Sequence, residues 1–159
     1  MRDRRFVENL DDDNKMKKEI YFIDDWDRQR KKEMELDFAD AIKSGGSVFG
    51  VFNENNGLIA FAVILSKPFG SSKQYVKMTH IHTSYEYRNQ GIGKELFKSC
   101  IIPKAKEFGA EKIYISSNFS EETQCFYKSL GCTDAQEIDK ESAEKEPYDR
   151  QLEYPLWTH

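Results

Sequence analysis

The chain has 159 residues, 38% of them hydrophobic and 33% charged, which is typical of a globular domain rather than of a disordered chain. Its formal net charge of −4 argues against a nucleic-acid-binding surface, for which a basic stripe is expected. The longest apolar run, Leu58 to Leu65, is far shorter than the roughly 20 residues that a membrane span needs, and the charged N-terminus indicates no signal peptide.

The cysteines are three in number, and the spacing of Cys100, Cys125 and Cys132 matches no zinc-binding pattern. An odd number without such a pattern favours reduced thiols in a cytoplasmic protein. We therefore expect residues 1–159 to form a single domain without a metal site. A chain of this length can bury a core large enough to fold without disulfide bonds.

The N-terminal part of the chain is the most highly charged. Twelve of the first nineteen residues carry charge, so we expect residues 1–18 to form a loosely held arm. The next segment, Glu19 to Ile23, is either a strand or a docking segment. A helix is predicted over Arg28 to Lys43, ended by Ser44-Gly45-Gly46.

A β-hairpin is predicted next, from Val48–Phe52 and Leu58–Ser66. Its turn contains Asn56-Gly57, which tolerates the positive φ of a tight turn. The second strand is apolar on both faces, which indicates a central position in the sheet. Another strand follows over Gln74 to Thr83.

A helix is expected from about Gly91 to Phe108, followed by a strand over Lys112 to Ser116. Pro103 lacks the N–H of an internal helical hydrogen bond and should bend the helix, and Gly109 should end it.

The C-terminal third begins with a helix that has Ser120 as its capping residue and Gly131 at its end. A strand is expected within Cys132–Ile138, a helical turn over Asp139–Glu146 and a last strand over Asp149–Tyr154. This order of elements predicts an α/β fold, with a mixed, partly antiparallel sheet flanked by helices.

The most informative segment, Tyr87 to Phe97, joins a predicted strand to a predicted helix. Its glycines, Gly91 and Gly93, let the backbone approach a ligand closely, and the helix start offers unpaired N–H groups and the positive end of the helix dipole. Such a junction is suited to binding phosphate, with Arg88 opening the loop.

Two other phosphate-binding loops do not fit these residues. A Walker loop would need glycine in place of Arg88 and serine or threonine in place of Glu95. A dinucleotide fingerprint would need glycine or alanine in place of Leu96, and a hairpin precedes the loop rather than the first half of a βαβ unit.

The stretch Ile81 to Gly93, followed by Cys125 to Cys132, resembles the GNAT family, the Gcn5-related N-acetyltransferases. The resemblance covers about Val48 to Leu152. It implies a GNAT-like sheet that is splayed at its centre, with acetyl-CoA as co-substrate in the cleft between the strands ending at Thr83 and Ser116.

By the same resemblance, the pyrophosphate meets the loop amides and the pantetheine arm pairs with the backbone of Ile81 and Thr83 like an added strand. Asn118 either bonds the pantetheine or caps the following helix, and family members often carry asparagine at the position of Ser120. The implied cofactor-binding residues are Ile81, Thr83, Arg88, Asn89, Gln90, Gly91, Ile92, Gly93, Lys94, Asn118, Ser120 and Tyr127.

The resemblance also implies that Tyr127 is the general acid that protonates the thiolate of coenzyme A; without it, Tyr127 would be interpreted as a core aromatic residue. The amine must also lose a proton. His82 and His80 are candidate bases because histidine is the side chain whose unperturbed pKa suits proton exchange near neutral pH. Strand alternation places both histidines on the face opposite Lys77 and Ile81, unless a bulge shifts the register.

Two functions follow from these observations. The first is direct transfer of an acetyl group from acetyl-CoA to a primary amine of a small molecule or peptide, such as a polyamine, an antibiotic or a protein terminus. The alternative is a non-catalytic acyl-CoA binding or sensing module. The resemblance makes a homodimer a reasonable expectation, and neither nucleic acid nor a membrane is an expected partner.

Overall fold

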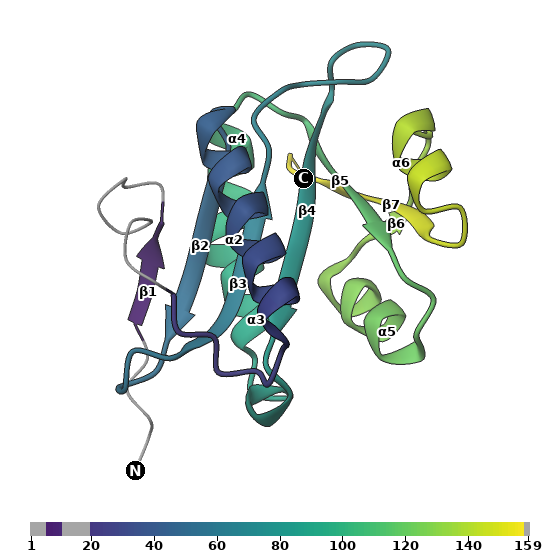
Figure 1. Ribbon diagram of the computed structural model, residues 1–159. Coiled ribbons are helices and arrows are strands. Elements are labelled where there is room, and N and C mark those ends of the chain that lie inside the picture. Colours follow the sequence, from purple (N-terminus) through teal and green to yellow (C-terminus); the bar gives the residue numbers. More distant parts are fainter. Residues whose placement is uncertain (1–5, 11–19, 158–159) are drawn as a thin grey trace.

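The computed structural model describes residues 6–10 and 20–157, and within them the strands form one seven-stranded sheet (Figure 1). All neighbouring strands are antiparallel except β4 and β5, which are parallel. In sheet order, the strands are β1 (Phe6–Asn9), β2 (Ser47–Phe52), β3 (Leu58–Ile64), β4 (Tyr75–Thr83), β5 (Lys112–Ser117), β7 (Arg150–Pro155) and β6 (Thr133–Asp134).

Helices cover both faces of this sheet. On one face, α2 (Arg28–Lys43) buries Met34, Phe38 and Ala41 against β2 and β3. On the other face lies one continuous helix made of α3 (Ile92–Leu96), the π-helical turn η2 (Phe97–Ile101) and α4 (Ile102–Glu107), which packs into the larger hydrophobic cluster. The mixed α/β sheet flanked by helices is therefore confirmed.

Two further helices, α5 (Glu121–Leu130) and α6 (Lys140–Lys145), lie beside β5 and β7 (Figure 1). Ser120 caps α5 by accepting a hydrogen bond from the N–H of Thr123, and Gly131 ends it with a φ of 102°, as predicted. None of the helices in the described part of the chain has the length and apolar character needed to cross a bilayer.

The N-terminal prediction needs a correction. Within the arm expected over residues 1–18, Phe6–Asn9 forms β1 and pairs with β2, and Leu10 is buried with its N–H bonded to the carbonyl of Val48. A strand forms here because the edge of β2 offers backbone partners and Leu10 supplies an apolar anchor. Residues 1–5 and 11–19 lie outside the described residues.

The long helix and β6 also differ in detail from the sequence prediction. The N–H of Ile102 bonds to the carbonyl of Phe97, five residues back, and this π-helical turn directly precedes Pro103, which has no N–H to continue the ladder. β6 has only two residues because the chain then leaves the ladder: the N–H of Gln136 bonds to the carboxylate of Glu153, and the N–H of Glu137 bonds to the hydroxyl of Tyr75.

The centre of the sheet is splayed, as predicted. Parallel pairing of β4 with β5 covers only Tyr75–Lys77 and Lys112–Tyr114, after which the two strands separate (Figure 1). On the other side of β4, the partners of His80 and Met78 are Val63 and Ile64, so the register shifts by one residue there. This β-bulge at Thr79 ends the simple alternation of β4.

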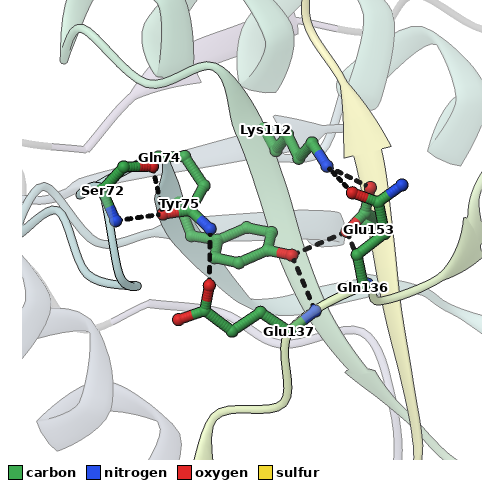
Figure 2. A network of polar contacts seen from close by, with 7 residues as sticks. All are labelled: Ser72, Gln74, Tyr75, Lys112, Gln136, Glu137 and Glu153. Carbon is green, nitrogen blue, oxygen red and sulfur yellow. Dashed lines mark hydrogen bonds and ion pairs between the residues drawn. The ribbon is translucent and has the colours of Figure 1, made fainter.

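Where the two central strands still pair, a buried polar network holds them together (Figure 2). The carboxylate of Glu153, which is 4% exposed, accepts hydrogen bonds from the hydroxyl of Tyr75 at 2.6 Å, from the ammonium of Lys112 at 2.7 Å and from the N–H of Gln136 at 2.9 Å. Burial alone would raise the pKa of Glu153, but these hydrogen bonds and the Lys112 charge outweigh it, so the pKa is lowered.

The lowered pKa predicts an acid-sensitive fold. The network stabilises the protein above the unfolded pKa of glutamate, about 4.3, and this stabilisation is lost as the pH falls through the lower folded value. Replacing Glu153 with Gln should reduce the free energy of unfolding at neutral pH by about 2 kcal/mol and flatten its decline in acid. Denaturant unfolding from neutral pH down to about pH 3 measures both.

Glu144→Gln on the exposed surface of α6 is the matched control, because it removes the same charge without touching the network. Equal acid dependence of the two variants would contradict the prediction.

Candidate active site

A cavity of about 710 Å³ opens where β4 ends and the long helix begins. One wall is the end of β4, with Ile81, His82 and Thr83. β4 pairs with β5 only as far as Lys77, so the edge of β4 beside this cavity has no neighbouring strand among the described residues. Such an edge offers unpaired backbone donors and acceptors to a ligand.

The second wall is the loop that leads from β4 into α3. A turn of 3₁₀ helix (η1, Tyr85–Tyr87) is followed by two residues with positive φ, Asn89 at 63° and Gly91 at 79°. The first hydrogen bond of α3 runs from the N–H of Glu95 to the carbonyl of Gly91, so the preceding amides of the first turn have no intrahelical acceptor. These amides and the helix dipole favour an anion.

Gly93 is needed for close packing rather than for its backbone angle. A Cβ added there would lie 3.1 Å from Cε1 of Phe126 on α5, whereas one added at Gly91 would meet no atom within 4 Å. A side chain at position 93 would therefore require the ring of Phe126 to move by a few tenths of an ångström, so glycine favours the close approach of the loop to α5.

Arg88 supplies positive charge at the loop. Its Nε donates to the carbonyl of Thr83 at 3.1 Å, its Nη1 lies 3.5 Å from Oε2 of Glu122, and its guanidinium stacks over the ring of Tyr85. With Lys94 also on the wall, the loop combines cationic side chains with convergent amides, which suits a diphosphate.

The third wall comes from α5 and the segment before it. Asn118 shapes this segment, because its Oδ1 accepts from the N–H of Ser120 and its carbonyl accepts from the side chain of Gln124. Of the two roles left open for Asn118, the capping of α5 itself falls to Ser120. Three further residues on this wall, Glu122, Thr123 and Ser129, were not predicted from the sequence. They lie three or four positions from Cys125 or Phe126, and this helical spacing, which places them on one face of α5, could have identified them.

The cavity brings most of the predicted site residues together. Its lining includes Ile81, His82, Thr83, Arg88, Asn89, Gly91, Ile92, Gly93, Lys94, Asn118 and Ser120. Gln90, His80 and Tyr127 are not part of this lining.

Tyr127 lies on α5 with its ring in the large hydrophobic cluster, 8% exposed and in edge contact with Phe126. Its hydroxyl makes no hydrogen bond within the described residues. Burial raises the pKa of Tyr127 above its ordinary value, and Cys132 and Asp149 raise it further, so the phenol stays protonated at neutral pH.

His80 lines a second cavity of about 660 Å³, between α2, β4 and the region of α6. Its Nδ1 lies 2.9 Å from Oγ1 of Thr79 and its Nε2 lies 3.7 Å from Asp37 of α2. Burial lowers the pKa of His80, although Asp37 opposes this shift. Lys77 lines the same cavity. Strict alternation would place Lys77 and His80 on opposite faces of β4, and the bulge at Thr79 brings them to one side.

His82 lies in the first cavity and forms a contact that the sequence did not reveal. Its Nε2 lies 2.7 Å from Oδ2 of Asp24, in the segment before α2. The ring of His82 also packs beside Trp26, at a centroid distance of 5.1 Å, and Phe61, at 5.3 Å. Since Asp24 precedes His82 by 58 residues, no local spacing could have identified the pair.

Comparisons with known proteins agree with this geometry. The sequence model described as the acetyltransferase (GNAT) family matches residues 10–132. No curated protein matches the chain in sequence.

Similar solved structures share the fold at low sequence identity. A GNAT-family acetyltransferase from Staphylococcus aureus Mu50 has a TM-score of 0.71 at 19% identity, covering 97% of this chain and 100% of its own. The ribosomal-protein-S18-alanine N-acetyltransferase from Escherichia coli has a TM-score of 0.60 at 15% identity, with 98% and 96% coverage. The N-acetylglutamate synthase from Neisseria gonorrhoeae, complexed with coenzyme A and N-acetyl-glutamate, has a TM-score of 0.62 at 15% identity, covering 96% of this chain and 36% of its own.

Proposed function

This chain belongs to the GNAT family of acetyltransferases, and we propose that it transfers the acetyl group of acetyl-CoA to a primary amine by direct attack of the amine on the thioester. The observation that carries the proposal is the first cavity, in which loop amides and Arg88 converge beside the open edge of β4. Acetyl-CoA has a diphosphate for the first feature and an amide-bearing arm for the second.

In the proposed complex, the diphosphate accepts hydrogen bonds from the amides of Gln90 to Lys94 and from Arg88. The pantetheine arm pairs with the backbone of Ile81 and Thr83 and passes Asn118 and Ser120. Coenzyme A bound to the Neisseria gonorrhoeae synthase supports this choice of co-substrate. By their names, that enzyme and the Escherichia coli relative both make N-acetyl groups, which favours an amine acceptor.

The proposed reaction forms a C–N bond and breaks the C–S bond. Holding the amine and the thioester together supplies much of the rate, and backbone N–H groups stabilise the developing oxyanion. Tyr127 donates a proton to the departing thiolate; this role rests on the family resemblance of its segment, because Tyr127 does not line the cavity, and the burial that keeps its hydroxyl protonated also makes it a weaker acid. His82 is favoured over His80 as the base, because His82 lines the cavity and His80 is engaged elsewhere.

Thiol release from acetyl-CoA with a panel of amines tests this function directly. We expect release that depends on both substrates, with small amines and peptide N-termini as the two arms of the panel. Calorimetric binding of coenzyme A without turnover of any amine would favour the acyl-CoA binding module, and the absence of binding would overturn both functions.

The phosphate loop gives a prediction with an internal control. Gly91 and Gly109 both have positive φ, 79° and 83°, and an added Cβ would meet nothing within 4 Å at either position. Alanine at either position should therefore cost about 1 kcal/mol of stability. Only Gly91→Ala should also raise the Kd of coenzyme A, by roughly tenfold or more, because only Gly91 lines the cavity. Equal Kd values in the two variants, measured by calorimetry, would argue against the loop as the diphosphate site.

Tyr127→Phe separates the acid role from a packing role. The phenol makes no hydrogen bond within the described residues, so its removal should leave the free energy of unfolding nearly unchanged. We expect kcat to fall roughly 10²-fold, with the Kd of coenzyme A changed less than about twofold. Steady-state thiol release and calorimetry measure these quantities, and an unchanged kcat would exclude Tyr127 as the acid.

A further inference from the structure

Asp24 and His82 form a partly buried pair at the wall of the first cavity. Their side chains are 19% and 27% exposed, and Oδ2 of Asp24 lies 2.7 Å from Nε2 of His82. A carboxylate can only accept, so Nε2 carries the hydrogen and Nδ1 of the neutral ring carries the lone pair. Nδ1 has no hydrogen-bond partner within the described residues. The pair therefore leaves a nitrogen lone pair available beside the cavity.

The carboxylate of Asp24 is anchored by the backbone on both sides. Before it, Phe22 bridges to Leu58 at the start of β3, and the N–H of Ile23 donates to the carbonyl of Leu58 at 3.3 Å. After it, Asp27 caps α2 by accepting from the N–H of Arg30 at 2.7 Å. Asp24 thus lies in a short segment fixed to the sheet at one end and to a helix at the other.

The imidazole ring of His82 is confined as well. Phe61 is its direct neighbour on β3, and Trp26 packs against it from the segment that carries Asp24. Arg30 stacks on the ring of Trp26, with its guanidinium carbon 4.9 Å from the centroid. Aromatic contacts on the ring and a charged hydrogen bond at one nitrogen fix both its orientation and its tautomer.

We propose that Asp24 is a positioning residue for His82 in the proposed acetyl transfer, on which this inference rests. The amine nitrogen forms the new bond to the acetyl carbon and the C–S electron pair leaves with sulfur. The amine proton passes to Nδ1 of His82 and the sulfur takes its proton from Tyr127. Asp24 holds Nε2–H throughout and stabilises the imidazolium that forms.

His80 does not offer the same arrangement. Its nearest carboxylate oxygen is 3.7 Å away on Asp37, and its other ring nitrogen contacts the hydroxyl of Thr79. A separation of 3.7 Å exceeds the length of a hydrogen bond, so Asp37 cannot fix the tautomer of His80.

Asp24→Asn, compared with Asp25→Asn, tests the proposal. Asp25 is exposed and adjacent, so its replacement removes the same charge without touching His82. For Asp24→Asn we expect kcat to fall roughly tenfold or more, with the Kd of coenzyme A changed less than about twofold. Asp24→Glu should recover part of the loss, and Asp25→Asn should behave like the wild type.

The split between turnover and binding separates positioning from a structural role. A purely structural role of Asp24 would weaken coenzyme A binding and lower the free energy of unfolding together with kcat, whereas positioning of His82 affects kcat alone. A kcat of Asp24→Asn equal to that of Asp25→Asn, or a loss of kcat matched by a loss of coenzyme A affinity, would overturn the proposal.

A measurement that needs no turnover distinguishes this inference from the proposed function. Long-range ¹H–¹⁵N NMR of the histidine rings should show the Nε2–H tautomer of His82 in the wild type and its partial loss in Asp24→Asn. The Nδ1–H tautomer in the wild type would overturn the inference alone. A wild type that acetylates no amine would overturn the proposed function, and the role of Asp24 with it.

Discussion

The separation of β4 from β5 is the constraint on which the rest of the structure depends. The two strands pair over three residues each and then diverge, so beyond Lys77 the edge of β4 that faces β5 has no strand neighbour in the part of the chain that the structure describes. An open edge inside a domain must find other partners for its polar backbone groups. The cavity beside Ile81 and Thr83 leaves this edge accessible to a ligand, and it is the edge on which the proposed pantetheine pairing depends.

Strands that separate at one end must be held together where they still pair. The carboxylate of Glu153 ties Tyr75 of β4 to Lys112 of β5, which are the first of the three paired positions, and the chain after β6 adds the N–H groups of Gln136 and Glu137 (Figure 2). A fully bonded buried network is rigid, whereas a partly bonded one would be costly. The network therefore holds the paired end of the two strands together. Beyond the bulge at Thr79 the register is regular, so His80 and His82 lie on the same face of β4, beside Phe61, and they reach different cavities because they lie at different positions along the strand.

Features set by neighbouring residues were predictable from the sequence, and those set by distant contacts were not. The helix over Arg28–Lys43, the hairpin and the glycine loop follow from caps, alternation and turn residues that act within a few positions. β1 depends on the edge of β2, and Asp24 depends on a partner on β4, so composition alone suggested only a charged arm and an unassigned segment. The family model likewise matches from residue 10, whereas the resemblance that the sequence motifs indicated began only at about Val48.

The cavity mouth illustrates how a site can be ordered before its ligand arrives. Arg88 lies against Thr83, Tyr85 and the carboxylate of Glu122, so its guanidinium already points across the loop. Glu122 is exposed, and surface ion pairs of this kind are worth only about 0 to 1 kcal/mol, so the proposed diphosphate would replace the carboxylate at little cost. The hydrogen bond to the carbonyl of Thr83 does not depend on Glu122. In the proposed complex the loop would therefore keep its shape, and the binding energy of the anion would not be spent on ordering it.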